Sequence, residues 1–275
     1  MSEMVALGKA GAAIRKANDE GRAGLVGYLP AGYPSYDGGV DAIKALVDGG
    51  VDVLEIGLPY SDPVMDGPAI QRAAEAALAG GFRVKDLLRT VEAVAAYSDV
   101  PVLVMTYWNP IERYGVDRWA VDFAGVGGAG LITPDLIPEE AAEWIAAADK
   151  NELDKVFLVS PSSTDERIRL TTAACRGFVY ATAVMGVTGV RETASDLAAP
   201  LVARTKAATG LPVGVGIGVS NAEQAAAIGA FTDAVIVGSA FVKRLLDGEG
   251  PAGVRSLTES LAEGVRREPS AAAGR

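Results

Sequence analysis

The chain has 275 residues, of which 49% are hydrophobic and only 6% aromatic, with 33 glycines and a net charge of −10. An acidic chain without a long apolar run is a poor match for nucleic acid or an anionic membrane, so we expect neither as a partner. The sequence contains no histidine, which excludes histidine-based triads, imidazole bases and histidine-ligated zinc.

Eight short apolar runs recur along the chain, each too short for a helix and bounded by glycine or proline. In chain order these predicted strands are Gly24–Leu29, Val51–Gly57, Val102–Met105, Gly130–Thr133, Val156–Val159, Gly177–Ala181, Leu211–Val215 and Ala234–Val237. Amphipathic helical segments lie between them, including Asp37–Val47, Val84–Ala96, Pro138–Ala148, Asp165–Ala174, Ala194–Ala207 and Ala222–Ile228. Ser220 is the expected N-cap of the last of these, with Glu223 in capping-box position.

Alternating strands and helices predict a parallel sheet joined by right-handed crossovers. Eight such units favour an α/β fold of the (β/α)8 TIM barrel type, and a doubly wound open sheet is the alternative. An extra N-terminal helix, about Met4–Asn18, is expected to close the bottom of the barrel. We expect one barrel domain over residues 1–268 and a disordered tail over residues 269–275.

Two carboxylates follow the second predicted strand. Glu55 lies inside the apolar run Val53–Leu58, where an ionised side chain is costly unless it is paired or used in chemistry. Burial raises the pKa of a carboxyl group, which suits a general acid near neutral pH. Asp66 lies in the next loop, which three prolines stiffen. The structural alternatives are a salt-bridged or outward-facing Glu55 and an Asp66 that only forms a turn.

Glycines follow the last three predicted strands. The sixth strand precedes Gly186-Val187-Thr188-Gly189, which we expect to form a mobile lid. Gly216 and Gly218 follow the seventh strand, and Gly238 and Ser239 follow the eighth, each pair just before a predicted helix. Barrels often hold phosphate after strands 7 and 8, against backbone N–H groups at helix starts. The sequence therefore predicts a phosphate site there, although the glycines also fit plain tight turns.

Residues of other mechanisms are missing from the strand ends. The eight lysines lie at positions 9, 16, 44, 85, 150, 155, 206 and 243, none at the carboxyl end of a predicted strand, so a Schiff-base mechanism has no obvious nucleophile. No cluster of metal ligands stands out, so no metal is expected, and neither a dinucleotide motif nor a P-loop occurs. Acid–base catalysis by carboxylates remains, helped by Tyr180 at the end of the sixth strand. A single cysteine, Cys175, and the lack of a secretory signal predict a cytoplasmic protein.

These motifs resemble those of the tryptophan synthase alpha chain family. The stretch Leu54–Gln71 (LEIGLPYSDPVMDGPAIQ) is similar to the family's most diagnostic segment, and Gly186–Gly189 is similar to its strand-6 loop. Gly214–Glu223 (GVGIGVSNAE) and Val237–Lys243 (VGSAFVK) resemble its phosphate site, and Pro134-Asp135-Leu136 resembles its strand-4 turn. The resemblance covers nearly the whole chain, in order and without large gaps.

The resemblance implies a lyase of tryptophan biosynthesis that cleaves indole-3-glycerol phosphate to indole and glyceraldehyde 3-phosphate by a retro-aldol reaction. It implies that Glu55 protonates indole C3 and that Asp66 stabilises the charge developing on the indole N–H. The further contacts that it implies are Tyr180 close to Glu55, Thr188 orienting Asp66, Tyr28, Met105 and Leu131 around the indole, and Gly189, Gly216, Gly218, Gly238 and Ser239 on the phosphate.

The same resemblance implies a partner. The family works with a PLP-dependent beta chain in an α2β2 heterotetramer and passes indole through a tunnel, so PLP is expected only in the partner and no cofactor in this chain. Pro59, Asp62 and Asn109 are expected near that contact. The sequence departs from better-known members at Ala183-Val184-Met185, where many have Ser-Arg-Ser, and at Tyr28, where many have Phe.

Two other functions stay open at this point. An isomerase or epimerase of another phosphorylated sugar would share the phosphate site, although such enzymes usually use a lysine, a histidine or a metal pair. A non-catalytic subunit that only activates a partner would not need both carboxylates.

Overall fold

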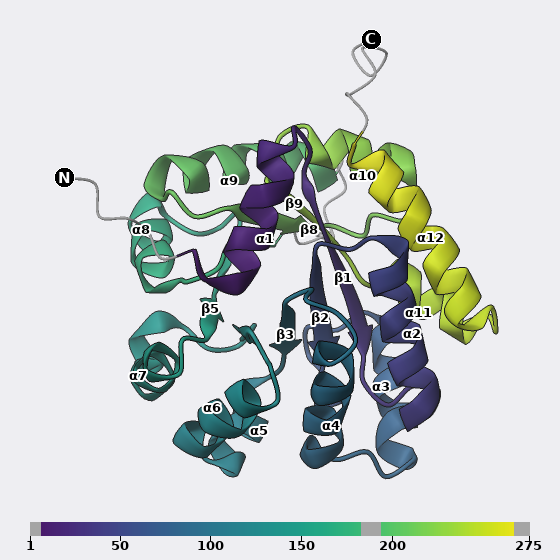
Figure 1. Cartoon of the computed structure of the whole chain (residues 1–275). Helices are drawn as coiled ribbons and strands as arrows, with labels where there is room; N and C mark the ends of the chain where they lie inside the picture. The colour runs from purple at the N-terminus through teal and green to yellow at the C-terminus, as the bar shows by residue number, and fades with distance from the viewer. Residues whose placement is uncertain (1–6, 183–193, 267–275) are drawn as a thin grey trace.

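The computed structural model describes residues 7–182 and 194–266. Nine strand segments in these residues form one sheet, with helices packed around it (Figure 1). The strands are β1 (Gly24–Pro30), β2 (Val53–Gly57), β3 (Val102–Met105), β4 (Gly130–Ile132), β5 (Asp154–Val156), β6 (Leu158–Val159), β7 (Val179–Thr182), β8 (Val213–Gly216) and β9 (Ala234–Val237). Their order in the sheet is β5-β4-β3-β2-β1-β9-β8-β7-β6, and neighbouring strands pair in parallel.

The two outermost strands of this sheet, β5 and β6, are consecutive segments of one stretch of chain. β5 pairs with β4, β6 pairs with β7, and only Phe157 separates them. The carbonyl of Phe157 accepts a hydrogen bond from the Tyr180 N–H at 3.2 Å, which continues the ladder across the gap. The fifth predicted strand therefore forms two segments because its pairing partner changes at Phe157. The sheet closes into a barrel, which confirms the predicted fold class and excludes the open sheet.

Helices connect the strands and cover the outer face of the barrel (Figure 1). They are α1 (Gly8–Asp19), α2 (Tyr36–Gly49), α3 (Pro68–Ala79), α4 (Val84–Ala95), α5 (Trp108–Tyr114), α6 (Val116–Gly125), the 3-10 helix η1 (Pro138–Glu140), α7 (Ala142–Lys150), α8 (Asp165–Ala174), α9 (Ala194–Ala208), α10 (Ala222–Gly229), α11 (Ser239–Leu246) and α12 (Gly250–Gly264). None of the helices in the described ranges combines the length and the apolar character that a membrane crossing requires.

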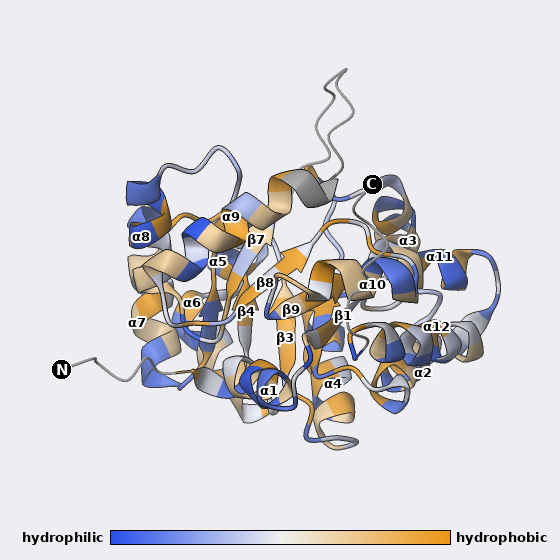
Figure 2. Ribbon diagram, turned by 90° about the horizontal axis from the view of Figure 1, so that it is seen from above, coloured by the Kyte–Doolittle hydropathy of each residue, from blue (hydrophilic) through white to orange (hydrophobic). Residues whose placement is uncertain are grey.

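Side chains alternate between the two faces of each strand, so the barrel has two apolar layers. Leu54 and Ile56 of β2 belong to the larger cluster between the sheet and the helices, whereas Val53 belongs to a smaller cluster inside the barrel. Both faces of the strands are therefore covered, and every residue of β1 and β2 is buried. Figure 2 shows the result as hydrophobic strands at the centre, with hydrophilic residues on the helices around them.

Helix α1 closes the end of the barrel where the strands begin. Its residues Ala10 and Ile14 are fully buried in the interior cluster. The carboxylate of Asp154, at the start of β5, accepts a hydrogen bond from the Ala10 N–H at 2.8 Å and so caps the first turn of the helix. This agrees with the predicted position of the N-terminal helix, and it leaves the opposite end of the barrel open for a ligand.

One predicted helix start is wrong. The sequence favours Ser220 as the N-cap of α10, with Glu223 completing a capping box. In the structure Asn221 is the N-cap, and its side chain accepts a hydrogen bond from the Gln224 N–H at 2.9 Å. Ser220 instead donates from its backbone N–H and its hydroxyl to the Gln224 side chain. Both residues are good capping types, and the sequence does not distinguish between neighbouring candidates.

Candidate active site

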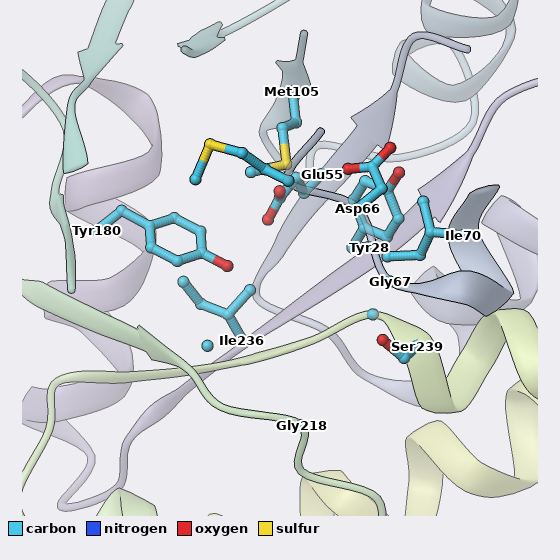
Figure 3. A pocket seen from close by; sticks show the side chains of 13 residues that line it. Tyr28, Glu55, Asp66, Gly67, Ile70, Met105, Tyr180, Gly218, Ile236 and Ser239 are labelled. Atoms are coloured by element: carbon cyan, nitrogen blue, oxygen red, sulfur yellow. The ribbon is translucent and has the colours of Figure 1, made fainter. Parts of the chain in front are cut away.

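A cavity of about 230 Å³ opens at the carboxyl ends of the strands, the end that carries the active site in barrels of this type. Strands β1, β2, β3, β7, β8 and β9 each contribute to it, and so do the loops that follow several of them (Figure 3). The residues that line the cavity are Tyr28, Glu55, Met65, Asp66, Gly67, Ile70, Met105, Tyr180, Gly216, Gly218, Ile236, Gly238 and Ser239.

Glu55 reaches this cavity from the middle of β2 and is only 2% exposed. Its Oε2 atom is buried without a hydrogen-bond partner among the described residues. Burial, and secondarily the negative charge of Asp66, raises the pKa of Glu55 from 4.5 to about 8. Among the described residues no cation pairs with Glu55, and the side chain faces the cavity, so this part of the structure supports neither alternative for Glu55. The group is protonated at neutral pH and can donate a proton to whatever occupies the cavity.

Asp66 lies at the far end of the loop between β2 and α3, half-buried beside the cavity. The backbone of this loop is fixed on both sides of the carboxylate. The Asp66 N–H donates to the Pro63 carbonyl at 3.1 Å, and the Gln71 side chain donates to the Asp66 carbonyl at 2.8 Å. Burial raises the pKa of Asp66 and a hydrogen bond from Tyr107 lowers it. The two carboxylates therefore differ in environment, since one is fully buried and the other lies at the cavity wall.

Two tyrosines fit the barrel interior because a glycine lies diagonally across from each on the next strand, two residues beyond the register partner of the tyrosine. A Cβ atom on Gly57 would come within 2.3 Å of the Tyr28 hydroxyl, and one on Gly216 would come within 2.4 Å of the Tyr180 hydroxyl. Burial raises the pKa of both phenols well above the usual value; neighbouring carboxylates raise it further, Asp66 before Glu55 at Tyr28 and Glu55 at Tyr180. Both groups therefore stay protonated and can donate hydrogen bonds in the cavity, which Figure 3 shows them facing.

The opposite wall of the cavity is made of backbone and small side chains. Gly218 has φ of +75°, the left-handed region that favours glycine, and a Cβ atom added there would have no neighbour within 4 Å among the described residues. Gly238 is the N-cap residue of α11 and Ser239 is its first residue. The N–H groups of a helix start carry partial positive charge, so this wall can bind an anion. Figure 3 places Gly218 and Ser239 across the cavity from Met105.

The structure brings most of the predicted residues together. Nine of them line one cavity: Tyr28, Glu55, Asp66, Met105, Tyr180, Gly216, Gly218, Gly238 and Ser239. Thr188 and Gly189 fall outside the described residues, as do the expected lid and the tail over residues 269–275.

Leu131 requires a correction, because it does not line the cavity. It is fully buried in the outer cluster between the sheet and the helices. Its neighbour Ile132 faces the interior and pairs in register with Met105. Adjacent residues of a strand face opposite sides of the sheet, so Leu131 lies on the outer face and Ile132 on the inner one.

Four residues that line the cavity are not predicted from the sequence. Met65 and Gly67 flank Asp66, Ile70 lies in the first turn of α3, and Ile236 lies on β9. A signal exists for Ile236, because it lies two residues before Gly238 and two-residue periodicity places both on one face. No such signal exists for Ile70, which reaches the cavity from a helix.

Within the described ranges, no group of three or more histidine, cysteine, aspartate or glutamate side chains is arranged to hold a metal ion. The side chains and N–H groups of the cavity can instead supply three functions: a neutral acid, a second carboxylate and an anion-binding wall.

Comparisons with known proteins identify the family. A family model described as tryptophan synthase alpha chain matches residues 14–267. The curated tryptophan synthase alpha chain of Acidothermus cellulolyticus is 60% identical over 262 residues, covering 94% of this chain and 98% of the relative. That of Salinispora tropica is 58% identical over 264 residues, with the same coverage.

Solved structures agree with the sequence comparison. A structure of tryptophan synthase from Mycobacterium tuberculosis superposes with a TM-score of 0.88 at 53% identity, covering 94% of this chain and 99% of that one. A tryptophan synthase subunit alpha from Legionella pneumophila superposes with a TM-score of 0.86 at 31% identity, covering 95% and 99%. The chain therefore belongs to the tryptophan synthase alpha chain family.

Proposed function

We propose that Glu55 and Asp66 form the catalytic pair for the reaction of this family, the cleavage of indole-3-glycerol phosphate to indole and glyceraldehyde 3-phosphate. The observation that carries the assignment is the buried carboxyl of Glu55, whose pKa of about 8 keeps it protonated at neutral pH. A proton donor inside a cavity with an anion-binding wall is what retro-aldol cleavage of a phosphorylated indole requires.

The reaction begins when Glu55 donates its proton to indole C3. The ring then carries positive charge on N1 and becomes an electron sink, so no Schiff base is needed. The bond from C3 to the glycerol side chain breaks, and its electron pair restores the C2–C3 double bond and neutralises N1. The hydroxyl on the departing carbon loses its proton to the Glu55 carboxylate and becomes the aldehyde. Glu55 ends the cycle protonated, as it began.

Asp66 acts as a carboxylate that faces the indole N–H. Positive charge develops on N1 in the transition state, and a fixed negative group close to it lowers the barrier. Asp66 must therefore be ionised while Glu55 is protonated. The structure favours this division of roles, because Asp66 has a hydrogen-bond donor in Tyr107 and the Oε2 atom of Glu55 has no partner among the described residues.

The remaining cavity residues hold the substrate. The N–H groups around Gly216, Gly218 and Gly238, with the Ser239 hydroxyl, bind the phosphate. Tyr28 and Met105 pack against the indole ring, and Tyr180 lies near Glu55. The family resemblance also implies that Thr188 orients Asp66 and that Gly189 contacts the phosphate; both residues lie outside the described ranges. The chain needs no cofactor of its own for this chemistry, and the cytoplasm is the proposed location.

A PLP-dependent beta chain is the proposed partner, in an α2β2 heterotetramer. Exposed apolar side chains lie on the loops that follow β2 and β4: Val64 is 84% exposed, Met65, which lines the cavity, is 56% exposed, and Ile137 is 44% exposed. Apolar groups at the rim of an active site mark an interaction surface. Asn109 donates a hydrogen bond to the Tyr60 hydroxyl in the same region. This end of the barrel is where indole would leave toward the partner.

The direct test is indole release from indole-3-glycerol phosphate by the purified chain and its variants. We expect Glu55→Gln to lower kcat by at least about 100-fold, because it removes the transferable proton but keeps the shape. Asp66→Asn should lower kcat by a similar factor. Glu75→Gln, the same substitution at an exposed position of α3, is the matched control and should retain full activity. Full activity of Glu55→Gln would refute the assignment.

The two other functions considered from the sequence have less support. No lysine is among the described residues that line the cavity, and the chain has no histidine, so the usual groups of an isomerase or epimerase are not in place. A subunit without catalytic activity would not need a buried, protonated glutamate facing a second carboxylate.

A further inference from the structure

Tyr107, which neither the motifs nor the family resemblance singled out, contacts the proposed catalytic aspartate directly. Its hydroxyl accepts a hydrogen bond from the Met65 N–H at 2.9 Å and lies 3.5 Å from Asp66 Oδ1. Among the residues that the structure describes, no other side chain donates a hydrogen bond to the Asp66 carboxylate. The contact is long for an O–H···O bond, so a small movement of the carboxylate would strengthen it.

The direction of these hydrogen bonds is fixed by chemistry. A backbone N–H can only donate, so the Tyr107 hydroxyl must accept from Met65. Its own proton is then free to point at Asp66, and a hydroxyl can stabilise a carboxylate only in that orientation. Burial raises the pKa of Tyr107 to about 12, so the proton is present throughout the working range of an enzyme. The arrangement therefore favours the ionised form of Asp66.

The Tyr107 ring is held in place by burial and by stacking on a neighbouring ring. It is 6% exposed and stacks on Tyr60 with ring centroids 5.1 Å apart and an interplanar angle of 29°. The next residue, Trp108, donates its backbone N–H to both oxygens of Asp135 at 2.9 and 3.1 Å, which anchors the start of α5 to the loop after β4. The ring and hydroxyl therefore contact Tyr60 and Met65 on the loop that carries Asp66, while the backbone beside Tyr107 is anchored to the loop after β4.

The geometry points to Tyr107 as a positioning residue that holds the Asp66 carboxylate ionised and aimed at the cavity, across from Glu55. It links the loop after β2 to the loops after β3 and β4, while Gln71 fixes the same loop from the α3 side. The inference rests on the proposed function for the role of Asp66 in the reaction. The contact itself is independent of that function.

Tyr107→Phe tests this inference, because it removes the hydroxyl and keeps the ring that stacks on Tyr60. The pH profile of kcat for indole release should have an acidic limb from Asp66, which must be ionised, and an alkaline limb from Glu55, which must be protonated. Loss of the hydroxyl raises the pKa of Asp66, so the acidic limb should move to higher pH by about half a unit. The alkaline limb should stay in place, and kcat at its optimum should fall several-fold.

Tyr60→Phe is the matched control, since it removes a nearby hydroxyl that bonds Asn109 and not Asp66. A purely structural role of Tyr107 would lower the activity without shifting the acidic limb of the pH profile.

Carbon-13 NMR titration of aspartate-labelled protein measures the Asp66 pKa directly, with the signal assigned by its loss in Asp66→Asn. An unchanged Asp66 pKa in Tyr107→Phe overturns the inference. If the unmodified chain releases no indole, the proposed function fails, and the NMR titration still decides the role of Tyr107.

Discussion

At the scale of single residues, the most informative feature is a carboxyl group buried without a charge partner. Glu55 is 2% exposed, and its pKa rises to about 8 chiefly because burial disfavours the ionised form. A buried acid of this kind reduces the stability of the fold whenever it is ionised. Such a cost is expected at functional positions, where the requirement for a group of given pKa outweighs the stability lost.

The stability of a Glu55→Gln variant should show this cost. The pKa of Glu55 in the folded chain lies above its unfolded value of 4.5, so its contribution to stability is fully present below pH 4.5 and is lost as pH rises through about 8. A neutral glutamine does not titrate. The variant should therefore match the parent protein near pH 4 and exceed its stability by a few kcal/mol at pH 9, at about 1.4 kcal/mol per pKa unit.

Urea unfolding at several pH values measures this difference. Glu75→Gln, the same substitution at an exposed position of α3, is the matched control for the change of glutamate to glutamine. If the stability difference between Glu55→Gln and the parent protein does not change with pH, Glu55 is not a buried neutral acid in solution.

At the scale of secondary-structure elements, neighbouring strands fit together through pairs of one large and one small residue. Tyr180 on β7 occupies the space that a side chain on Gly216 of β8 would need. Tyr28 on β1 and Gly57 on β2 form a second such pair. The sequence suggests turn formation and phosphate binding for Gly216, and the structure gives it a packing role as well.

A double-mutant cycle tests the pair on β7 and β8. Gly216→Ala places a Cβ 2.4 Å from the Tyr180 hydroxyl, and since the Tyr180 ring is half-buried and packs against the interior cluster, the variant should lose about 1–3 kcal/mol of stability. Tyr180→Phe removes the clashing oxygen, so the double variant should recover much of this loss. Thermal unfolding measures all four proteins. Additive effects in the cycle would mean that the two residues do not contact each other in solution.

The strands and helices are largely predictable because each one leaves a pattern in its own short stretch of sequence. Short apolar runs between glycines predict eight strands, and the structure places a strand at each one. Ala234–Val237 and Asp165–Ala174 match the predicted bounds without change. The choice of face is not local: Leu131 and Ile132 are both apolar, and only the register with β3 decides which one faces inward.

At the scale of the whole molecule, the position of the site follows from topology. Parallel strands in a barrel present all their carboxyl ends at one rim, so Glu55 on β2 and Gly238 after β9 line one cavity although they lie far apart in the sequence. The hydrogen bonds that Tyr107 and Gln71 make with Asp66 could not be predicted from the sequence, because contacts between loops depend on the final geometry. These contacts come from the ends of neighbouring elements and have no periodic signature.

The same rim also presents the surface through which the whole molecule would meet its partner. Val64, in the same loop as Asp66, is 84% exposed, so a beta chain seated there would contact this loop directly and complete the site. We expect the beta chain to raise kcat for indole release. A charge at this apolar position should weaken docking, so Val64→Glu should need about ten times more beta chain for half-maximal activation. Val121→Glu, at an exposed apolar position on the outer helix α6, is the control and should leave activation unchanged. Titration of each variant with beta chain, followed by indole release, measures both effects. Equal kcat with and without the beta chain would contradict the coupling, and full activation of Val64→Glu would place the docking surface elsewhere.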